Sequence, residues 1–238
     1  MTDLVISEVC LKPPGRGGTG ALAAFLAGSA QRAGAAHHLV WSLFDDLGGQ
    51  RPFLYRLHGA SASDKITVVS QVPPGDRHDL WDIRHKPYAM LDTLKEGDRI
   101  AWALRVNATT RRTGSASRHC IVTQDRRMRG AQPSRTYVGR AESVLETAER
   151  VVPPWLVERL AGSAGMEVEP GAVRIGAHRR MEFDHAPGKP QQGRVVLSMT
   201  DTCGEATVVD ADALRSAVMK GVGAGRAFGC GLLLIRRL

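Results

Sequence analysis

The first half of the chain contains four short stretches rich in strand-forming apolar residues. The alternation of apolar and polar residues over 4–11 and the apolar runs within 51–58, 65–72 and 99–106 predict strands. Between the first two strands, small apolar residues predict a helix over 21–27, and Ser29 can cap a second helix that reaches Phe44. Residues 73–84 are expected to form a loop, and 87–94 a helical turn or two. The order β-α-β-β-(α)-β is that of a ferredoxin-like unit.

The second half also mixes helical and strand patterns. Helices are expected over 138–150, over 155–161 after Pro153-Pro154, and over 211–220. Strands are expected at Val168 and over 173–183, 193–199, 206–209 and 232–235. A second ferredoxin-like unit fits this order, so the predicted class is α+β with tandem ferredoxin-like (RRM-like) domains, a frequent RNA-binding scaffold. The predicted division is an N-terminal domain over 1–107, an arginine-rich linker over 108–135 and a C-terminal domain over 136–238.

Five glycines fall within eleven residues between the closing helix and the closing strand. The first, Gly221, is placed to cap the helix, and glycines this dense allow positive φ and close approach of backbone N–H groups to a partner. A phosphate is the expected partner, at Lys220, Gly223, Gly225 and Arg226. A dinucleotide-binding loop fits poorly, because Arg226 or Phe228 occupies its third glycine position and the element order is wrong. A turn that binds nothing remains the alternative.

Length and composition fit a globular protein with two modest cores. The 238 residues are 43% hydrophobic and 24% charged, and the four cysteines lie far apart without a C-x-x-C pair. A zinc site, a disulfide framework, a signal peptide and a membrane-spanning segment are therefore not indicated, and no acidic cluster suggests bound Mg²⁺. We expect a cytoplasmic protein with no metal, no cofactor and no membrane partner.

The positive charge of the chain is concentrated in one stretch. Between Arg105 and Arg140 there are nine arginines and one acid, so this stretch alone carries the net charge of +8 that the whole chain has. Arginine suits bidentate phosphate binding, and the glycines, serines and proline between the arginines indicate a flexible loop. A polyanion is therefore the expected partner, with a merely solvated charged face as the alternative.

One histidine is notable on the helix predicted to reach Phe44. Apolar residues at helical spacing form a stripe, and His37 falls at its edge with Trp41 one turn further along. The neighbouring His38 falls on the opposite, polar side. If the polyanion is RNA, a histidine can transfer protons while the 2′-hydroxyl attacks the adjacent phosphorus and cations stabilise the charged intermediate. A purely structural histidine is the alternative.

Several motifs resemble the CasE family, the CRISPR repeat endoribonucleases of subtype I-E Cascade. The most specific is the C-terminal G-V-G-A-G-R-A-F-G-C-G-L-L, followed by H-H-L-V-W-S-L-F, in which the family's catalytic histidine falls on His37. Lys86-Pro87-Tyr88, Gly97, the run L-R-V-N-A-T over 104–109, and Trp155-Leu156 with Gly165 are also similar to family patterns. Gly34 stands where many members have tyrosine, so the resemblance identifies no second proton-transfer group.

The resemblance implies a RAMP-type endoribonuclease that binds the stem-loop of the CRISPR repeat. It would cleave at the 3′ base of the stem without metal, leave a 2′,3′-cyclic phosphate, and stay bound as a Cascade subunit beside the guide-RNA backbone subunit. A basic hairpin with His178, Arg179, Arg180 and Lys189 is expected to lie along the stem. The other expected RNA contacts, along the backbone, are Arg105, Arg111, Arg112 and Arg118. A non-catalytic RNA-binding or assembly protein on the same scaffold is the alternative.

Overall fold

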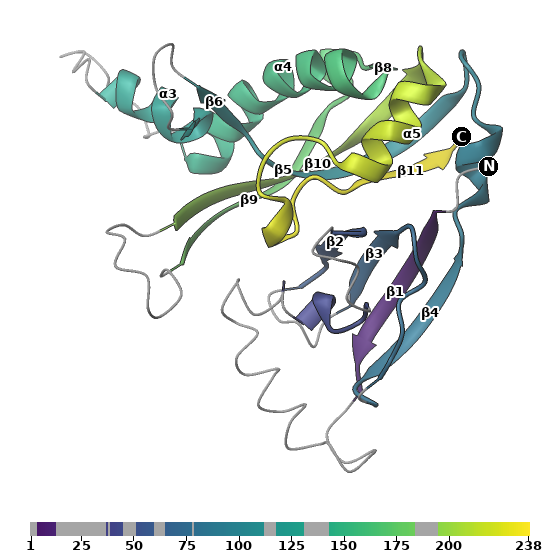
Figure 1. The fold of residues 1–238 in the computed structure, drawn as a ribbon. Helices are drawn as coiled ribbons and strands as arrows, with labels where there is room; N and C mark the ends of the chain where they lie inside the picture. The colour runs from purple at the N-terminus through teal and green to yellow at the C-terminus, as the bar shows by residue number, and fades with distance from the viewer. Residues whose placement is uncertain are drawn as a thin grey trace.

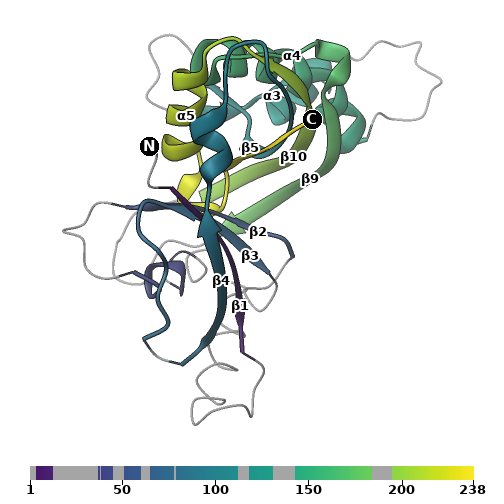
Figure 2. The same ribbon diagram turned by 90° about the vertical axis from the view of Figure 1, so that its right-hand side faces the viewer.

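The structure, a computed structural model, describes residues 4–12, 37, 39–44, 51–59, 65–77, 79–111, 118–130, 143–183 and 195–238. These residues form two larger antiparallel sheets and a small two-stranded one. In Figure 1 the second sheet lies above the first, with helices on its upper face. Figure 2 shows the same layers after a quarter turn. The predicted helix over 21–27 and most of the one capped by Ser29 lie outside the described residues.

The first sheet has the strand order β2-β3-β1-β4, which is the order of a ferredoxin-like unit. Its strands are β1 (Val5–Leu11), β2 (Phe53–Leu57), β3 (Ile66–Ser70) and β4 (Trp81–Pro87). β1, β2 and β3 confirm the strands predicted over residues 4–11, 51–58 and 65–72. The loop expected over 73–84 is wrong at its end, because β4 begins at Trp81 and pairs with β1 along its whole length. Most of β4 is exposed at the sheet edge, so it carries little apolar alternation.

The strand expected to complete the first unit belongs instead to the second sheet. β5 (Arg99–Asn107) pairs with β10 (Val195–Val208) and with β11 (Leu233–Arg237). The sheet has the order β11-β5-β10-β8, and β9 (Arg174–Phe183) also pairs with β10; β8 covers Met166–Glu167. The short helix η1 (Ala89–Thr93) links the sheets. The division between the two sheets therefore falls between β4 and β5, ahead of the expected domain end at residue 107.

Helices cover one face of the second sheet. α4 (Val144–Ala164) and α5 (Ala211–Lys220) lie over it, and α3 (Ile121–Gly130) contacts α4. The arginine-rich stretch expected to be a loop contains α3 and the small sheet of β6 (Thr109–Arg111) and β7 (Arg118–Cys120). The single-turn helices η2 (Pro170–Ala172) and η3 (Arg226–Phe228) complete the described elements. Among the described helices, none combines the length and apolar character needed to cross a membrane.

Two expected breaks are absent. α4 is one continuous helix with Pro153 and Pro154 inside it, capped by Ser143 in a capping box and ended by Gly165 at φ 57°. Each proline removes one backbone donor, but the buried stripe of Val152, Leu156 and Leu160 holds the helix on the core. β10 likewise runs unbroken through Gly204, where an added Cβ would lie 3.0 Å from the Trp102 ring.

The hydrophobic cores follow from strand alternation. In β2, Leu54 packs into the large cluster that also holds the helices of the second unit, whereas Phe53 and Tyr55 face a separate cluster with Val40 and Leu43. Both faces of the first sheet are thus buried, one against the second unit. The first sheet is consequently fixed in place relative to the second.

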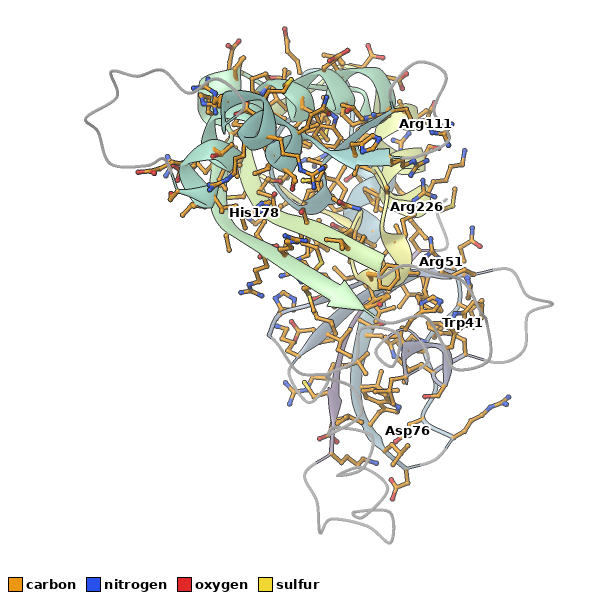
Figure 3. The ribbon with its side chains drawn as sticks, turned by 90° about the vertical axis from the view of Figure 1, so that its left-hand side faces the viewer. Trp41, Arg51, Asp76, Arg111, His178 and Arg226 are labelled. Atoms are coloured by element: carbon orange, nitrogen blue, oxygen red, sulfur yellow. The ribbon has the colours of Figure 1, made fainter. Side chains whose placement is uncertain are left out.

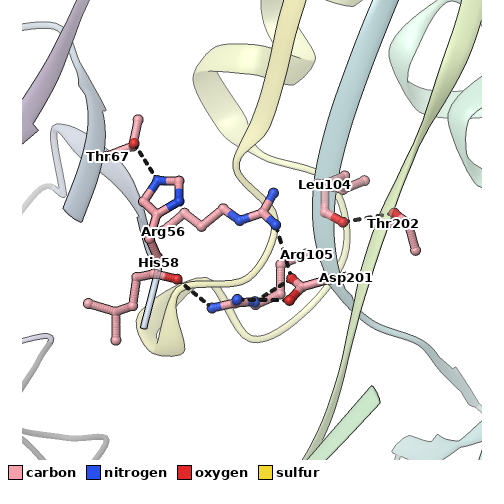
Figure 4. A network of polar contacts seen from close by, with 8 residues as sticks. Arg56, His58, Thr67, Leu104, Arg105, Asp201 and Thr202 are labelled. Carbon is pink, nitrogen blue, oxygen red and sulfur yellow. Dashed lines mark hydrogen bonds and ion pairs between the residues drawn. The ribbon is translucent and has the colours of Figure 1, made fainter. Parts of the chain in front are cut away.

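A largely buried polar network also joins the two sheets, between β2 of the first and β5 and β10 of the second (Figure 4). Arg105 of β5 donates through Nε and Nη2 to the two carboxylate oxygens of Asp201, at 2.7 and 3.0 Å, and through Nη1 to the carbonyl of Leu57, at 2.9 Å. Arg56 of β2 adds a third bond to Asp201, at 3.1 Å. One carboxylate of the second sheet therefore holds an arginine from each sheet.

Replacement of Asp201 is expected to destabilise the protein in a pH-dependent manner. Burial acts to raise the pKa of Asp201, but the hydrogen bond and charge of Arg105, with Arg56, hold that pKa below its ordinary value. The stabilisation is therefore complete above the unfolded-state pKa and is lost as pH falls through the lowered native pKa. We expect Asp201→Asn to lower the free energy of unfolding by about 2 kcal/mol at pH 7, since a partly exposed charged pair loses its anion.

The measurement is denaturant unfolding of both proteins at pH 7 and at pH 3, where the difference should shrink. Glu205→Gln is the matched control, because Glu205 of the same strand pairs with Arg99 on the surface, where an ion pair contributes about 0–1 kcal/mol. Equal effects of the two substitutions at pH 7 would contradict the structural role given to Asp201.

Candidate nucleic-acid interface

The glycine-rich turn between α5 and β11 is a closed loop that only glycines can form. All five glycines have positive φ, from 79° to 86°, which confirms the expectation from their density. Gly221 caps α5, with its N–H bonded to the carbonyl of Ala217. The turn folds on itself, because Val222 N–H donates to the carbonyl of Gly231 at 2.9 Å and Cys230 N–H to that of Gly225 at 3.2 Å.

The turn is pressed against the first sheet. An added Cβ at Gly221 would lie 3.0 Å from a methyl group of Leu54, and one at Gly229 would lie 3.4 Å from the ring of Tyr55. The Tyr55 hydroxyl donates to the carbonyl of Ala227 at 2.7 Å. Burial raises the pKa of Tyr55, so this phenol remains a neutral donor near pH 7. Gly223 differs from the others, since nothing lies within 4 Å of a Cβ added there.

His37 lies beside the tyrosine that contacts the turn. Its half-buried ring stacks on Tyr55 with centroids 6.3 Å apart, and Phe53 lies on another side at 6.2 Å. Trp41, one helical turn later, donates through Nε1 to Nε2 of His37 at 3.0 Å. As Nε2 accepts this bond, the neutral ring carries its proton on Nδ1. Residues 37, 55 and 227, far apart in the sequence, thus meet in one place.

An arginine that the sequence reasoning missed, Arg51, lies close enough to Tyr55 and Arg226 to interact with them electrostatically. Arg51 precedes β2 and is half-buried; burial and then the positive charge of Arg226 lower its pKa. Figure 3 shows Arg111, Arg226, Arg51 and Trp41 following one another along one side of the molecule. Two guanidinium groups that repel each other at a partly desolvated edge favour a bound anion between them. No motif marks Arg51, because it is an ordinary residue before a strand.

Arg226 also lines a cavity of about 770 Å³. We call it the α4 cavity, since the C-terminal half of α4 forms one wall and the glycine-rich turn and the β6–β7 hairpin form the others. Its lining includes three residues predicted to bind RNA and one further arginine that was not: Arg111, Arg118, Arg226 and Arg159. The predicted contact residue Gly223 lines it as well.

A second cavity, of about 440 Å³, lies between α3 and the long strands. Arg118 lines it as well as the α4 cavity, and Arg127 and Arg180 contribute two more guanidinium groups. The two cavities therefore share Arg118, and arginines line both of them. Arg127 was part of the arginine-rich stretch, but its helical position on α3 was not predicted.

The three consecutive basic residues of β9 do not share a face. His178 lies beside Thr200 and Arg180 beside Ser198, whereas Arg179, between them, lies beside Met199 on the opposite face. A hydrogen bond of 2.9 Å joins His178 Nδ1 to Thr200 Oγ1. The predicted basic hairpin therefore presents His178 and Arg180 on one face and Arg179 on the other.

Several residues predicted to contact RNA do not line either cavity. The Arg105 side chain is only 8% exposed and is committed to the Asp201 network. A Cβ added at Gly225 would lie 3.4 Å from the Cβ atoms of Asn107 and Cys230, and Lys220 is exposed at the end of α5. The predicted contact residues Arg112 and Lys189, and the histidine His38 expected at the surface, lie outside the described residues. Within the described part of the chain, no group of three or more potential metal ligands occurs among His, Cys, Asp and Glu.

Comparison with known proteins agrees with this architecture. A family model described as CRISPR associated protein matches residues 7–237, whereas none of the curated protein sequences matches the chain. Thermus thermophilus Cse3 bound to an RNA representing a pre-cleavage complex has 19% identity and a TM-score of 0.68, with 98% of each chain covered. Escherichia coli K-12 Cas6e has 17% identity and a TM-score of 0.53, over 98% of this chain and 100% of that one.

A chain of a CRISPR RNA-guided surveillance complex in a pre-nicking state is also similar, with 21% identity and a TM-score of 0.61, over 98% of this chain and 100% of that one. At these identities the likeness concerns the fold. It confirms the predicted α+β class with tandem ferredoxin-like domains across nearly the whole chain.

His178 is expected to be neutral at pH 7. Burial lowers its pKa below the ordinary value of 6.5. A histidine with a lowered native pKa reduces stability only below its unfolded pKa, so the native state should weaken as pH falls from about 6.5. The measurement is an NMR titration of the imidazole signals, with His178→Gln to assign the resonance. A midpoint at or above 6.5 in the RNA-free protein would contradict the buried setting.

Proposed function

The chain belongs to the family of CRISPR-associated proteins, and we propose that it is an endoribonuclease that binds the CRISPR repeat stem-loop and cuts precursor RNA at the 3′ base of the stem. The observation that carries this proposal is the meeting of His37, Tyr55 and the glycine-rich turn beside Arg51 and Arg226. A proton-transfer group and two phosphate-binding cations are then available at one edge. Binding of RNA by a relative of the same fold supports the substrate class.

The chemistry requires no group beyond side chains and the RNA itself. The 2′-hydroxyl loses its proton and attacks the adjacent phosphorus, and the 5′-oxygen of the next nucleotide leaves with a proton, so that a 2′,3′-cyclic phosphate and a 5′-hydroxyl remain. His37 serves one of the two proton transfers, because imidazole can accept or donate a proton near neutral pH. Arg51 and Arg226 stabilise the negative charge that grows on the phosphorane oxygens.

The basic surface accounts for binding of the rest of the RNA. Arg226 is continuous with Arg111 and Arg118 at the α4 cavity, and these with Arg180 at the second cavity. Each phosphate neutralised by an arginine releases counterions, so binding would be strongly salt-dependent. Lys220, exposed at the end of α5, belongs to the same predicted contact set, as do Arg112 and Lys189, which lie outside the described residues.

The cut RNA remains bound in this proposal, and the protein acts as a Cascade subunit. Its partners are the repeat RNA and other Cascade subunits, above all the guide-RNA backbone subunit, in the cytoplasm and without a cofactor. The similarity to chains of CRISPR RNA-guided surveillance complexes supports this placement. A product held by many phosphate contacts also limits turnover.

A non-catalytic RNA-binding protein is the second candidate, and one observation favours it. Trp41 occupies Nε2 of His37, the nitrogen that would otherwise be available to take up a proton. In that case His37 would only stabilise the helix against β2, and its replacement would affect stability and not cleavage.

Cleavage of the repeat RNA in EDTA separates the two candidates. We expect one cut at the 3′ edge of the stem, and His37→Ala should slow it by about 10²–10⁴-fold because one general acid–base group is lost. RNA affinity should be unchanged, as measured by filter binding. His38→Ala is the matched control and should cut like the wild-type protein.

A 2′-deoxy substitution at the scissile nucleotide tests the nucleophile, and it should abolish the cut while the RNA still binds. Normal cleavage by His37→Ala would exclude the catalytic role, and cleavage of the deoxy substrate would exclude 2′-hydroxyl attack. A requirement for divalent metal would exclude the metal-independent mechanism.

Replacement of Arg51 is expected to weaken RNA binding through one phosphate. Arg51→Gln should reduce the slope of log affinity against log salt by about one and should slow cleavage further than the loss of binding alone. Arg84→Gln is the control, since Arg84 is an exposed arginine on β4 at the opposite edge of the same sheet. Equal salt slopes for Arg51→Gln and the wild-type protein would exclude the phosphate contact.

A further inference from the structure

The α4 cavity lies next to the proposed cleavage site and is not needed for the proposed chemistry. Arg226 is the residue they share: it lines the cavity, and its charge acts on Arg51 near His37. The order Arg111, Arg226, Arg51 and Trp41 along one side of the molecule leads from the cavity to the tryptophan that is hydrogen-bonded to His37 (Figure 3). A strand whose phosphate lies between Arg51 and Arg226 therefore has the cavity as its next space in that direction.

The lining of the α4 cavity suits a nucleotide. Its volume of about 770 Å³ is in the range of small-ligand sites, and one wall is a flat cationic stack in which the Arg159 guanidinium lies 5.5 Å from the centre of the Trp155 ring. Arginine planes and aromatic rings are the surfaces on which unpaired bases stack. Thr109, Thr110 and Ser163 add hydroxyl groups that can bind the edge of a base.

The charge of the cavity also selects its occupant. Four arginines and one acid, Glu158, line it, so an anionic chain is favoured over a neutral or basic one. Duplex RNA is too wide to enter a cavity of this volume, whereas a single unpaired nucleotide fits. The strand that continues beyond a cut at the 3′ base of a stem is unpaired.

From this juxtaposition we infer that the α4 cavity binds the first unpaired nucleotide on the 3′ side of the cut. The inference rests on the proposed function, because it takes the cleavage position from there. The cavity would then make uncut RNA bind more tightly than the product. In uncut RNA one base stacks in the cavity, whereas the product ends at the cyclic phosphate and has no base there. The leaving strand then dissociates more readily than the stem.

One glycine allows the cavity to be filled without a change to the fold. Gly162 is exposed on α4 and lines the cavity, and nothing lies within 4 Å of a Cβ added there. A large side chain at this helical position can project into the cavity, and loss of a helical glycine does not destabilise α4. Gly162→Trp is therefore the blocking variant, and Gly162→Ala is its matched control.

The experiment compares three repeat RNAs with a 2′-deoxy scissile nucleotide, so that binding is measured without cleavage. One ends at the cut, one extends by unpaired nucleotides on the 3′ side, and one extends on the 5′ side. We expect the wild-type protein and Gly162→Ala to bind the 3′-extended RNA about tenfold more tightly than the RNA that ends at the cut. Gly162→Trp should bind these two RNAs equally, with unchanged affinity for the latter.

A second pair of variants tests the wall itself. Arg159→Ala should reduce the preference for the 3′-extended RNA, and Arg236→Ala, which removes an exposed arginine from β11 outside the cavity, should retain it. Thermal unfolding of each variant establishes that it is folded.

The outcomes separate the inference from the function it rests on. Equal binding of all three RNAs by the wild-type protein, or a 3′ preference that survives Gly162→Trp, overturns the inference and leaves the endoribonuclease intact; the cavity would then be open to a segment of a partner protein. A 5′ preference removed by Gly162→Trp assigns the cavity to the opposite strand and also overturns it. Failure to bind the stem-loop at all overturns the proposed function.

Discussion

The placement of the candidate site depends on the ion pair between Arg105 and Asp201. The side chain of Arg105 binds Asp201 of the neighbouring strand and the carbonyl of Leu57 in the first sheet, while its own carbonyl accepts the N–H of Gly231 in the turn. A single residue thus joins both sheets and the glycine-rich turn. His37 belongs to the first unit and Arg226 to the second, so their proximity follows from this junction.

The junction is polar although a hydrophobic contact would often be as stable. Paired charges that are largely buried gain little over apolar packing, but they favour one register, because any shift leaves a charge unpaired where little water reaches it. Leu54 and Val69 provide the apolar part of the contact. The two kinds of contact therefore have different roles. Hydrophobic burial holds the two units together, and the Asp201 network fixes where the turn meets β2.

Sequence reasoning succeeded where one residue type determines the local structure. Strand-forming apolar residues predict β1, β2 and β3, and the dense glycines predict a turn with positive φ, since other residues avoid that conformation. It failed where the answer depends on pairing. β5 reads as a strand, but only its partners β10 and β11 place it in the second sheet. Arg105 and Arg111 look alike in the sequence, and burial against Asp201 separates a structural arginine from a surface one.

The hydrogen bond from Trp41 to His37 has to be weighed against the chemistry proposed for that ring. It sets the orientation of the imidazole in the RNA-free protein and occupies Nε2. A neutral hydrogen bond contributes about 1 kcal/mol net, whereas hydrogen bonds to a charged group contribute about 1.5–3 kcal/mol. A phosphate that brings such bonds to the same edge can therefore displace the indole at little cost. The tryptophan can therefore orient the histidine in the RNA-free protein without preventing the proton transfer that we propose for it.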